Sequence, residues 1–542
     1  MEKHIAKVFG SALLPLLAVF VLVGCSDQEN NDTSGADTGN TVNPDSTVTS
    51  TSNTAGSEDG ISTATDSQTG SSSEEPASVN IAAATCGEDW VDYEVWPPAA
   101  ESVATTTLEM VEGVSDTTIR FGQSAAFSGA AGALGEGMKW GIRAAFHERN
   151  NAGGVGGRFL ELVSIDDCYE PDPARYNTEQ LIHDKDVFAL IGATGTPTSE
   201  VAAPAARKNR VPYVGPFTGA ELLREDFMDN VINFRASYFQ ETAIMVKRLS
   251  EDLGYDRIAV IFQNDSYGRE GYRGVVNALA DIDKQPVSTA YYTRNTEIVK
   301  GAVLDLQAGN PQAVIIIGAY KPTASLIRWS RKIGFNPVFM SVSFVGADAL
   351  AEEFRNNSMS TDDSEPAINP GVSEGAGVYI TQVVPFPRGN LQAGSNVSIT
   401  DGSLGDDSTY AEAVSAYSTA LVAYNKEFNT NLQPSFVSFE GYLVGRLAVM
   451  GLEVCEDNNN VTRKCFTDSL LDTDSFFIDG LELTFNDDKT SGDLSFDNQG
   501  SDKVFITVIN DNGDLEPVTV LTKPSNGRSD RPVSNDELVS AP

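Results

Sequence analysis

A glycine-rich pentapeptide is the first pattern in this sequence that could carry chemistry. Gly371-Val372-Ser373-Glu374-Gly375 matches G-x-S-x-G, the sharp turn that exposes the nucleophilic serine of α/β hydrolases. A hydrolase on that plan needs a later histidine, because the base follows the serine in chain order. All three histidines of the chain precede Ser373. The pattern therefore predicts a loop before a strand at 378–383, and we expect no enzyme.

A pair of carboxylates, Asp166 and Asp167, ends an expected strand at the carboxyl edge of a sheet. Adjacent acids there are more often turn formers and caps than an acid/base pair. No His, Cys, Asp or Glu cluster in the sequence has metal-ligand spacing, and 487–493 lacks the acidic ladder of an EF-hand. We therefore expect no catalytic residue, no metal and no cofactor.

Two loops between an expected strand and an expected helix could bind a ligand. In the first, Gly129, Gly132, Gly135 and Gly137 differ in spacing from G-x-G-x-x-G, and no G-K-[ST] follows. This loop is not typical of nucleotide binding, yet backbone N–H groups at a helix start can hold a small anionic ligand.

The second loop, 192–198, is richer in hydroxyl groups, since it contains Thr194, Thr196 and Thr198. Pro197 suits the first turn of a helix. Hydroxyl and free N–H groups at that place are well suited to a carboxylate, and ligands of open α/β sheets lie beyond the carboxyl ends of strands. The alternative is that Thr196 only caps the helix.

Strand and helix signals alternate from position 116 onward, in two series. Expected strands cover 118–123, 159–165, 187–191 and 211–214, then 257–262, 287–292, 313–317 and 338–341. Expected helices cover 132–151, 172–184, 198–208, 239–253, 268–280, 298–307, 323–333, 410–428 and 439–453. Such alternation predicts parallel sheets with helices on both faces, and two series predict two lobes. Residues 481–508 indicate a β-rich end, and 511–514 a hairpin turn.

The first 25 residues indicate an export signal. Lys3 and Lys7 precede an apolar stretch at 8–23, which is shorter than the roughly 20 residues that a membrane span needs. The following tetrad, Leu22-Val23-Gly24-Cys25, resembles a bacterial lipobox, in which the cysteine is acylated and becomes the mature N-terminus. An ordinary signal peptide is the alternative. We expect an exported protein, lipid-anchored to a membrane in the periplasm or at the cell surface.

Residues 26–80 are rich in Ser, Thr, Asp, Asn and Gly, and predict a disordered acidic tether. Residues 81–115 form a further acidic N-terminal segment, and 521–542 predict a loose tail. The formal net charge is −39, from 76 acidic and 37 basic residues. Such a chain repels nucleic acid and anionic headgroups, so we expect neither as a partner. A solubility or high-salt adaptation would explain the same charge.

Five cysteines are present, of which Cys25 is assigned to lipid. The other four, Cys86, Cys168, Cys455 and Cys465, suggest two disulfides in an exported protein, with three possible pairings. Cys455 and Cys465 flank a polar segment, which makes a short closure plausible and leaves Cys86 with Cys168.

Several segments resemble, in order, the type I periplasmic binding proteins of the leucine/isoleucine/valine-binding family. They are 121–129 (FGQSAAFSG), 150–158 (NNAGGVGGR), 166–171 (DDCYEP), 215–220 (GPFTGA), 234–238 (FRASY), 264–268 (NDSYG) and 500–505. The resemblance spans about 116–520 and implies an α/β fold with two doubly wound lobes, joined by about three crossover strands. Members of this family are extracytoplasmic receptors that deliver a solute to an ABC importer.

The resemblance also implies ligand-binding positions. They are Phe127, Ser128, Gly129, Thr194, Thr196, Phe217, Thr218, Gly219, Tyr238, Tyr267, Tyr320 and Ser343. Thr196 would place a hydroxyl on a ligand carboxylate, and Tyr267 and Tyr320 would close over the ligand from the second lobe. The amino-acid binders carry an acid near Ser343, but 339–344 contains none. The usual partner of Cys168 falls near Gly195, so Cys86 is a substitute candidate.

Family topology implies the lobe boundaries. Residues 116–237 and 384–493 would form lobe I, residues 238–383 and 494–520 lobe II, with crossings near Tyr238, Val383 and Asp493. We expect a monomeric lipoprotein that binds a small amino-acid-, amide- or carboxylate-like ligand and meets an ABC permease. The alternative is a lipoprotein of the same fold that senses a ligand for a sensor kinase or a cell-wall synthase; a cleft filled by side chains would favour it.

Overall fold

The computed structural model describes residues 91–93, 111–356, 372–388, 399–400, 403–404, 410–457, 460–473, 475–485 and 497–523. The chain divides into two units, 1–78 and 79–542, and all described residues belong to the second. The expected leader, lipid-bearing Cys25, tether, Cys86 and most of the tail therefore lie outside the described residues. So do Gly371 of the G-x-S-x-G motif and most of residues 356–367 and 388–407.

The first sheet has six strands in the order β1-β3-β2-β4-β5-β6. They are β1 (Val91–Tyr93), β2 (Thr118–Ala125), β3 (Phe159–Asp166), β4 (Ala189–Ile191), β5 (Tyr213–Val214) and β6 (Val231–Ile232). All neighbours are parallel except β1, which pairs antiparallel with β3. The 81–115 segment thus contributes an edge strand that the alternation pattern does not reveal.

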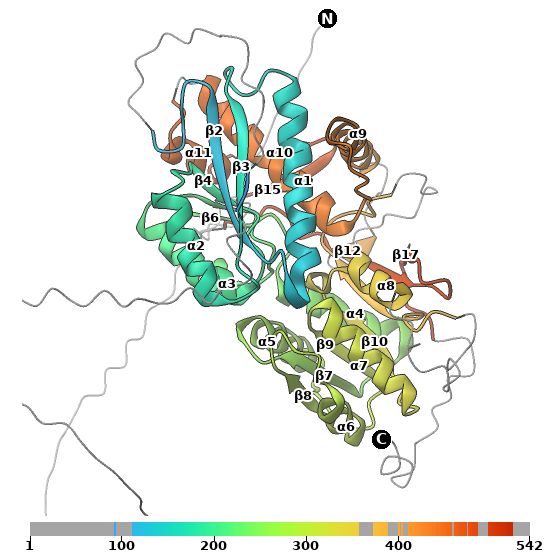
Figure 1. Ribbon diagram of the computed structural model, residues 1–542. Helices are drawn as coiled ribbons and strands as arrows, with labels where there is room; N and C mark the ends of the chain where they lie inside the picture. Colours follow the sequence, from blue (N-terminus) through green and yellow to red (C-terminus); the bar gives the residue numbers. More distant parts are fainter. Residues whose placement is uncertain are drawn as a thin grey trace, which may run out of the picture. The chain divides into compact units, whose positions relative to one another are not determined.

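Helices cover both faces of this sheet (Figure 1). They are α1 (Gly132–Asn151), α2 (Pro171–His183), α3 (Thr196–Lys208), α10 (Phe436–Asp457) and α11 (Arg463–Leu471), while α9 (Ala411–Phe428) packs on α1 and α10. Because side chains alternate along a strand, Leu160 and Leu162 join the core beside α1, whereas Val163 and Ile165 join the core beside α2 and α3. A Cβ on Gly141 would lie 2.0 Å from the carbonyl oxygen of Ser438, so α1 and α10 can cross this closely only at a glycine.

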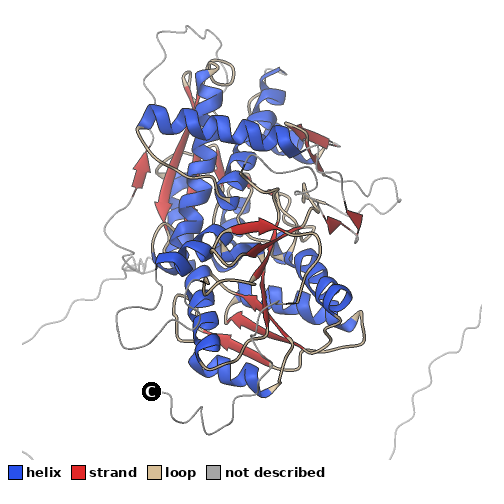
Figure 2. Cartoon of the chain, turned by 90° about the vertical axis from the view of Figure 1, so that its right-hand side faces the viewer, coloured by secondary structure: helices blue, strands red, loops and turns tan. Residues whose placement is uncertain are grey.

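The second sheet has seven strands in the order β17-β16-β11-β10-β9-β7-β8. They are β7 (Ile258–Gln263), β8 (Thr289–Tyr292), β9 (Ala313–Ile317), β10 (Val338–Ser341), β11 (Tyr379–Gln382), β16 (Phe505–Ile509) and β17 (Leu515–Pro517). Its helices are α4 (Tyr238–Leu253), α5 (Ser266–Ala280), α6 (Lys300–Ala308), α7 (Tyr320–Lys332) and α8 (Ala347–Asn356). Figure 2 shows these strands with helices on either side. β16 and β17 are antiparallel additions to a parallel core.

The two sheets belong to two lobes, and the chain crosses between these lobes three times. It leaves the first sheet after β6, returns from β11 to α9, and crosses again before β16. Two short antiparallel hairpins lie in the sequence between β11 and β16. They pair β12 (Ile399–Thr400) with β13 (Ser403–Leu404), and β14 (Ser475–Ile478) with β15 (Leu481–Thr484). The two-lobed α/β architecture is as predicted, and the residue boundaries of the lobes stay a prediction.

The element predictions differ in how well they fit. The helix at 132–151 and the strands at 313–317 and 338–341 have the predicted bounds. The apolar pattern does not predict α8 and α11, because each is short, with 10 and 9 residues. The hairpin turn at 511–514 is confirmed, since Ile509 opposes Leu515.

The disulfide Cys455–Cys465 is confirmed, and it ties the last turn of α10 to α11 across the short segment that joins these helices. Cys168 is also disulfide-bonded. Its predicted partner, Cys86, lies outside the described residues, so that pairing stays a prediction.

Removing the Cys455–Cys465 bond should destabilise lobe I. A closure over a sequence separation of 10 residues restricts the unfolded chain, so the variant Cys455→Ala/Cys465→Ala should lose about 2–3 kcal/mol in the free energy of unfolding. Denaturant unfolding followed by circular dichroism measures this loss. An unchanged midpoint would contradict a stabilising role of the bond.

Candidate functional site

Hydroxyl groups gather where two loops follow neighbouring strands of the first sheet. Thr194 follows β4, Thr218 follows β5, and a parallel bridge joins Thr194 to Phe217. Thr196 is the first residue of α3, whose N-cap is Gly195. The Thr196 hydroxyl lies 2.7 Å from that of Thr218 and makes no capping bond. The alternative that Thr196 only caps the helix is therefore wrong.

The first residue of α4, Tyr238, extends this group of hydroxyls. Its OH lies 3.2 Å from Thr218 Oγ1, and its N–H donates to the Gly219 carbonyl at 2.6 Å. A Cβ on Gly219 would lie 2.8 Å from the Tyr238 nitrogen, so the approach requires glycine. Burial raises the pKa of Tyr238 to about 12, which keeps its hydroxyl neutral. The hydroxyl of Thr194, also fully buried, has no partner among the described residues.

Aromatic rings from the two lobes meet beside these hydroxyls. Phe344 belongs to a single 3₁₀ turn, Ser343–Val345, of lobe II. Its ring centroid lies 5.5 Å from that of Phe217, 5.8 Å from that of Tyr169 and 4.5 Å from that of Tyr267. Each of these rings is at most 1% exposed, so the contact between the lobes is dry and apolar here.

A buried arginine joins lobe I to this aromatic contact. Arg235 donates to both carboxylate oxygens of Glu440 in α10, at 2.8 and 2.7 Å, and to the Ser343 hydroxyl at 3.0 Å. Its guanidinium carbon lies 4.1 Å from the centroid of the Phe217 ring. Burial by itself would lower the pKa of Arg235, but the Glu440 carboxylate raises it above the ordinary value, so the side chain stays charged.

A second buried acid reaches Ser343 from α4. Glu241 accepts hydrogen bonds from the Ser343 backbone N–H at 2.7 Å, from its hydroxyl at 2.9 Å, and from the Thr381 hydroxyl. Burial raises the pKa of Glu241, although Arg235 and these hydrogen bonds oppose the rise. The acid that the sequence lacks near Ser343 is thus supplied by a helix about a hundred residues earlier in the chain.

A model of the periplasmic binding protein family matches residues 118–514, which is more than half of the chain. The chain belongs to this family. It is a type I binding protein of the leucine/isoleucine/valine-binding group, as the sequence resemblance implied. Membership implies an exported protein whose general role is solute binding. Among the described residues, no helix is long and apolar enough to cross a membrane.

Named relatives agree with this assignment. The chain is 23% identical over 372 residues to "Leu/Ile/Val-binding protein homolog 7" of Brucella abortus (strain 2308), covering 63% of this chain and 92% of the relative. A solved structure of "a possible leucine/isoleucine/valine-binding protein" from Rhodopirellula baltica SH 1 is 33% identical, with a TM-score of 0.61 over 76% of this chain and 98% of the other. The branched-chain amino acid binding protein LivJ of Streptococcus pneumoniae, solved with isoleucine, is 17% identical, with a TM-score of 0.57 over 74% and 99%, and shows the fold alone.

The structure brings many of the implied ligand positions together. Thr194, Thr196, Phe217, Thr218, Gly219, Tyr238 and Tyr267 form one buried cluster, and Ser343 joins it through Arg235. The remaining four have other recorded contacts. The Gly129 carbonyl accepts from Lys321 at 3.3 Å, and Tyr320 is the first residue of α7. Phe127 and Ser128 contact the Asp166–Cys168 turn. Their roles in binding stay predictions.

Sequence reasoning missed Arg235, Glu241, Glu440, Tyr169 and Phe344 as members of the site. Glu440 carried a usable signal, since an acid within the apolar run at 436–444 predicts a buried cationic partner. The other four gave no such signal.

The expectation that Asp166 and Asp167 are turn formers fits the structure. Asp166 accepts from the backbone N–H groups of Phe127 and Cys168, and Asp167 accepts from the Tyr169 N–H and the Ser124 hydroxyl. Burial raises the pKa of Asp167 to about 8, against the lowering effect of these hydrogen bonds. Asp167 thereby fixes the position of Tyr169 beside Phe344.

Asp167 should make stability pH-dependent. The folded state holds the Asp167 proton more tightly than the unfolded chain does, in which this carboxyl has a pKa near 3.8. The protonated carboxyl therefore stabilises the folded protein fully below about pH 4, and this stabilisation is lost as the pH rises towards 8. Asp167→Asn mimics the neutral acid. Its free energy of unfolding, relative to wild type, should rise between pH 4 and 8 by up to about 1.4 kcal/mol per pH unit. Denaturant melts across this range measure the difference, and a pH-independent difference would refute a raised pKa.

Proposed function

We propose that this chain is an extracytoplasmic binding lipoprotein, anchored through acylated Cys25, that captures a small carboxylate ligand between its lobes for an ABC importer. One observation carries the proposal. The buried hydroxyls of Thr196, Thr218 and Tyr238 are hydrogen-bonded in series at the start of α3, and the buried hydroxyl of Thr194 belongs to the loop directly before it.

A carboxylate fits this place for physical reasons. The first N–H groups of α3 lack intrahelical acceptors, and the helix dipole favours negative charge there. The Thr194 hydroxyl, without a partner in the described chain, would gain one from a ligand oxygen. Arg235 is directed elsewhere, because its Nε, Nη1 and Nη2 each donate to Glu440 or Ser343 and the Glu440 carboxylate compensates its charge.

The rest of the ligand should be apolar. Rings of Tyr169, Phe217, Tyr267 and Phe344 lie beside the hydroxyls and offer no charge. This surface suits an aliphatic side chain of the kind named for the relatives. An amino group would depend on Glu241, whose oxygens are bonded to Ser343 and Thr381, so a deaminated analogue could bind as well.

Binding would proceed by closure of the lobes. The hydroxyls of Thr194, Thr196 and Thr218 belong to lobe I, and Tyr267 and Phe344 belong to lobe II. A ligand held first by lobe I would shift the population towards closed molecules, which the importer would recognise.

A sensor or regulator of the same fold is the second candidate function. The observation in its favour is that rings of the two lobes pack directly on each other, with Phe344 against Phe217 and Tyr169. Such a protein would signal its closed state to a partner without transport.

A matched set of compounds tests the ligand class. Leucine, its keto acid and its amide differ only in the amino and carboxylate groups. We expect thermal stabilisation by the two carboxylates, corresponding to about 2.7 kcal/mol at a hundredfold excess over Kd, and none by the amide. Native mass spectrometry of the purified protein tests whether a small carboxylate co-purifies with it. Equal stabilisation by the amide, or no stabilisation in a broad metabolite screen, would overturn the proposal.

Thr196→Val tests the residue-level assignment, because it keeps shape and removes the hydroxyl. A charge-assisted hydrogen bond is worth roughly 1.5–3 kcal/mol, so affinity for a stabilising carboxylate should fall about ten- to a hundredfold by calorimetry. Thr178→Val is the matched control, since Thr178 is also buried but bonds the Ala174 carbonyl within α2. The control should lose stability without losing affinity. Equal affinity of both variants would move the ligand away from Thr196.

A further inference from the structure

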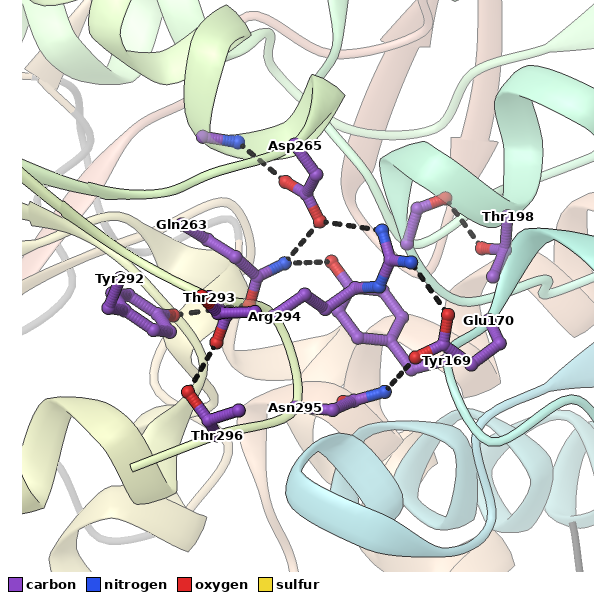
Figure 3. A network of polar contacts seen from close by, with 12 residues as sticks. Tyr169, Glu170, Thr198, Gln263, Asp265, Tyr292, Thr293, Arg294, Asn295 and Thr296 are labelled. Carbon is purple, nitrogen blue, oxygen red and sulfur yellow. Dashed lines mark hydrogen bonds and ion pairs between the residues drawn. The ribbon is translucent and has the colours of Figure 1, made fainter. Parts of the chain in front are cut away.

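A polar network joins the lobes outside the hydroxyl cluster (Figure 3). On lobe I it consists of the turn after β3. On lobe II it consists of the segment after β8 and the end of β7. Arg294 donates to Glu170 at 2.6 Å, and Asn295 donates to the other oxygen of that carboxylate at 2.8 Å. Asn295 also donates to the Cys168 carbonyl at 3.1 Å, and Gln263 to the Tyr169 hydroxyl at 3.3 Å.

The lobe I side of this network is held in place by its own lobe. Cys168 and Tyr169 adopt φ values of +50° and +61°, a region that costs energy for residues with side chains. The carboxylates of Asp166 and Asp167 hold this conformation through the Cys168 and Tyr169 N–H groups. Pro171 begins α2 directly afterwards. The turn is therefore ordered without any help from lobe II.

The lobe II side is preformed as well. Asp265 caps α5 by accepting from the Gly268 N–H, and its other oxygen binds Gln263 at 2.6 Å and Arg294 at 3.2 Å. Thr296 closes the turn after β8 by donating to the Thr293 carbonyl. Figure 3 shows Arg294 extended between Asp265 and Glu170. Its guanidinium thus stays anchored in lobe II whether or not Glu170 is near.

The Glu170 carboxylate makes its recorded hydrogen bonds across the boundary between the lobes. Glu170 is the N-cap residue of α2, yet its side chain makes no capping bond. In the described part of the chain, both of its carboxylate oxygens bond only to Arg294 and Asn295 across the boundary. A carboxylate with this set of partners contributes to closure and not to the folding of lobe I.

We propose that Glu170, Arg294 and Asn295 form an interlobe latch that sets the closed fraction of the protein without touching the ligand. The latch rests on the closure assumed in the proposed function, but not on the ligand's identity. Glu170 and Arg294 are 41% and 21% exposed, so water and salt can reach the pair. The latch is therefore weak enough to open, in contrast to the buried Arg235–Glu440 pair.

Interlobe distances in the full mature chain test the latch without any ligand. Spin labels carried by a non-canonical residue at the exposed positions 176, on α2, and 291, on β8, leave the cysteines intact. Glu170→Gln and Arg294→Gln should each lower the ratio of short to long distances about two- to fivefold, as expected for a half-exposed ion pair. The double variant should change no more than a single one, because both remove the same pair.

The matched control is Arg207→Gln, which breaks the 2.8 Å exposed pair of Arg207 with Asp229 inside lobe I. It should leave the distance distribution unchanged. The difference between wild type and Glu170→Gln should shrink from about 0.01 M to about 1 M salt, as the pair is screened. A distribution that Glu170→Gln leaves unchanged, or a wild type that shows only long distances, would overturn the latch. Absence of ligand binding would instead overturn the proposed function and leave these distances unaffected.

Discussion

The buried guanidinium of Arg235 is the interaction on which the site depends. It lies in the crossover between β6 and α4, and it binds Glu440 of lobe I and Ser343 of lobe II at once. Its removal would leave Glu440 buried without a cation, which typically lowers the free energy of unfolding by about 3–5 kcal/mol. The same group supports the Phe217 ring and, through Ser343, orients the turn that carries Phe344. The Arg235–Glu440 pair at the crossover between β6 and α4 therefore helps to position the aromatic contact between the lobes.

Two kinds of contact between the lobes follow from this arrangement. The contact of Arg235 with Glu440 and Ser343 is fully buried, so separating it would leave an unpaired buried charge. The Glu170–Arg294 contact lies at the accessible boundary, where water can replace each partner. A protein that opens and closes needs both, since the first preserves the register of the lobes and the second can be exchanged at low cost.

The sequence predicted what is local. Apolar spacing followed by Gly153-Gly154 defined α1, and strand runs without charge defined β9 and β10, because these patterns act over one element. Loops at the carboxyl ends of strands located Thr194 and Thr196 for the same reason. Pairings across the chain were not predictable: Arg235 and Glu440 are 205 residues apart, and Glu170 and Asn295 are 125 apart. A charged residue shows its side-chain type in a sequence but not its burial, so the acid facing Ser343 could not be assigned to Glu241.

The negative net charge of the chain makes the positions of Arg235 and Arg294 important for bringing the lobes together. With 76 acidic and 37 basic residues, the average long-range interaction between parts of this chain is repulsive, which disfavours compact arrangements. Arg235 and Arg294 stand where such repulsion would matter most, each between two acids: Arg235 beside Glu440 and Glu241, Arg294 beside Glu170 and Asp265. If the lobes open and close as proposed, salt would act on closure in two opposite directions. It would weaken the general repulsion, which favours closing, and it would weaken the specific Glu170–Arg294 attraction, which favours opening. The attraction acts over hydrogen-bonding distance and the repulsion over the whole chain, so at low salt the proposed closure would depend on specific pairs such as Glu170–Arg294.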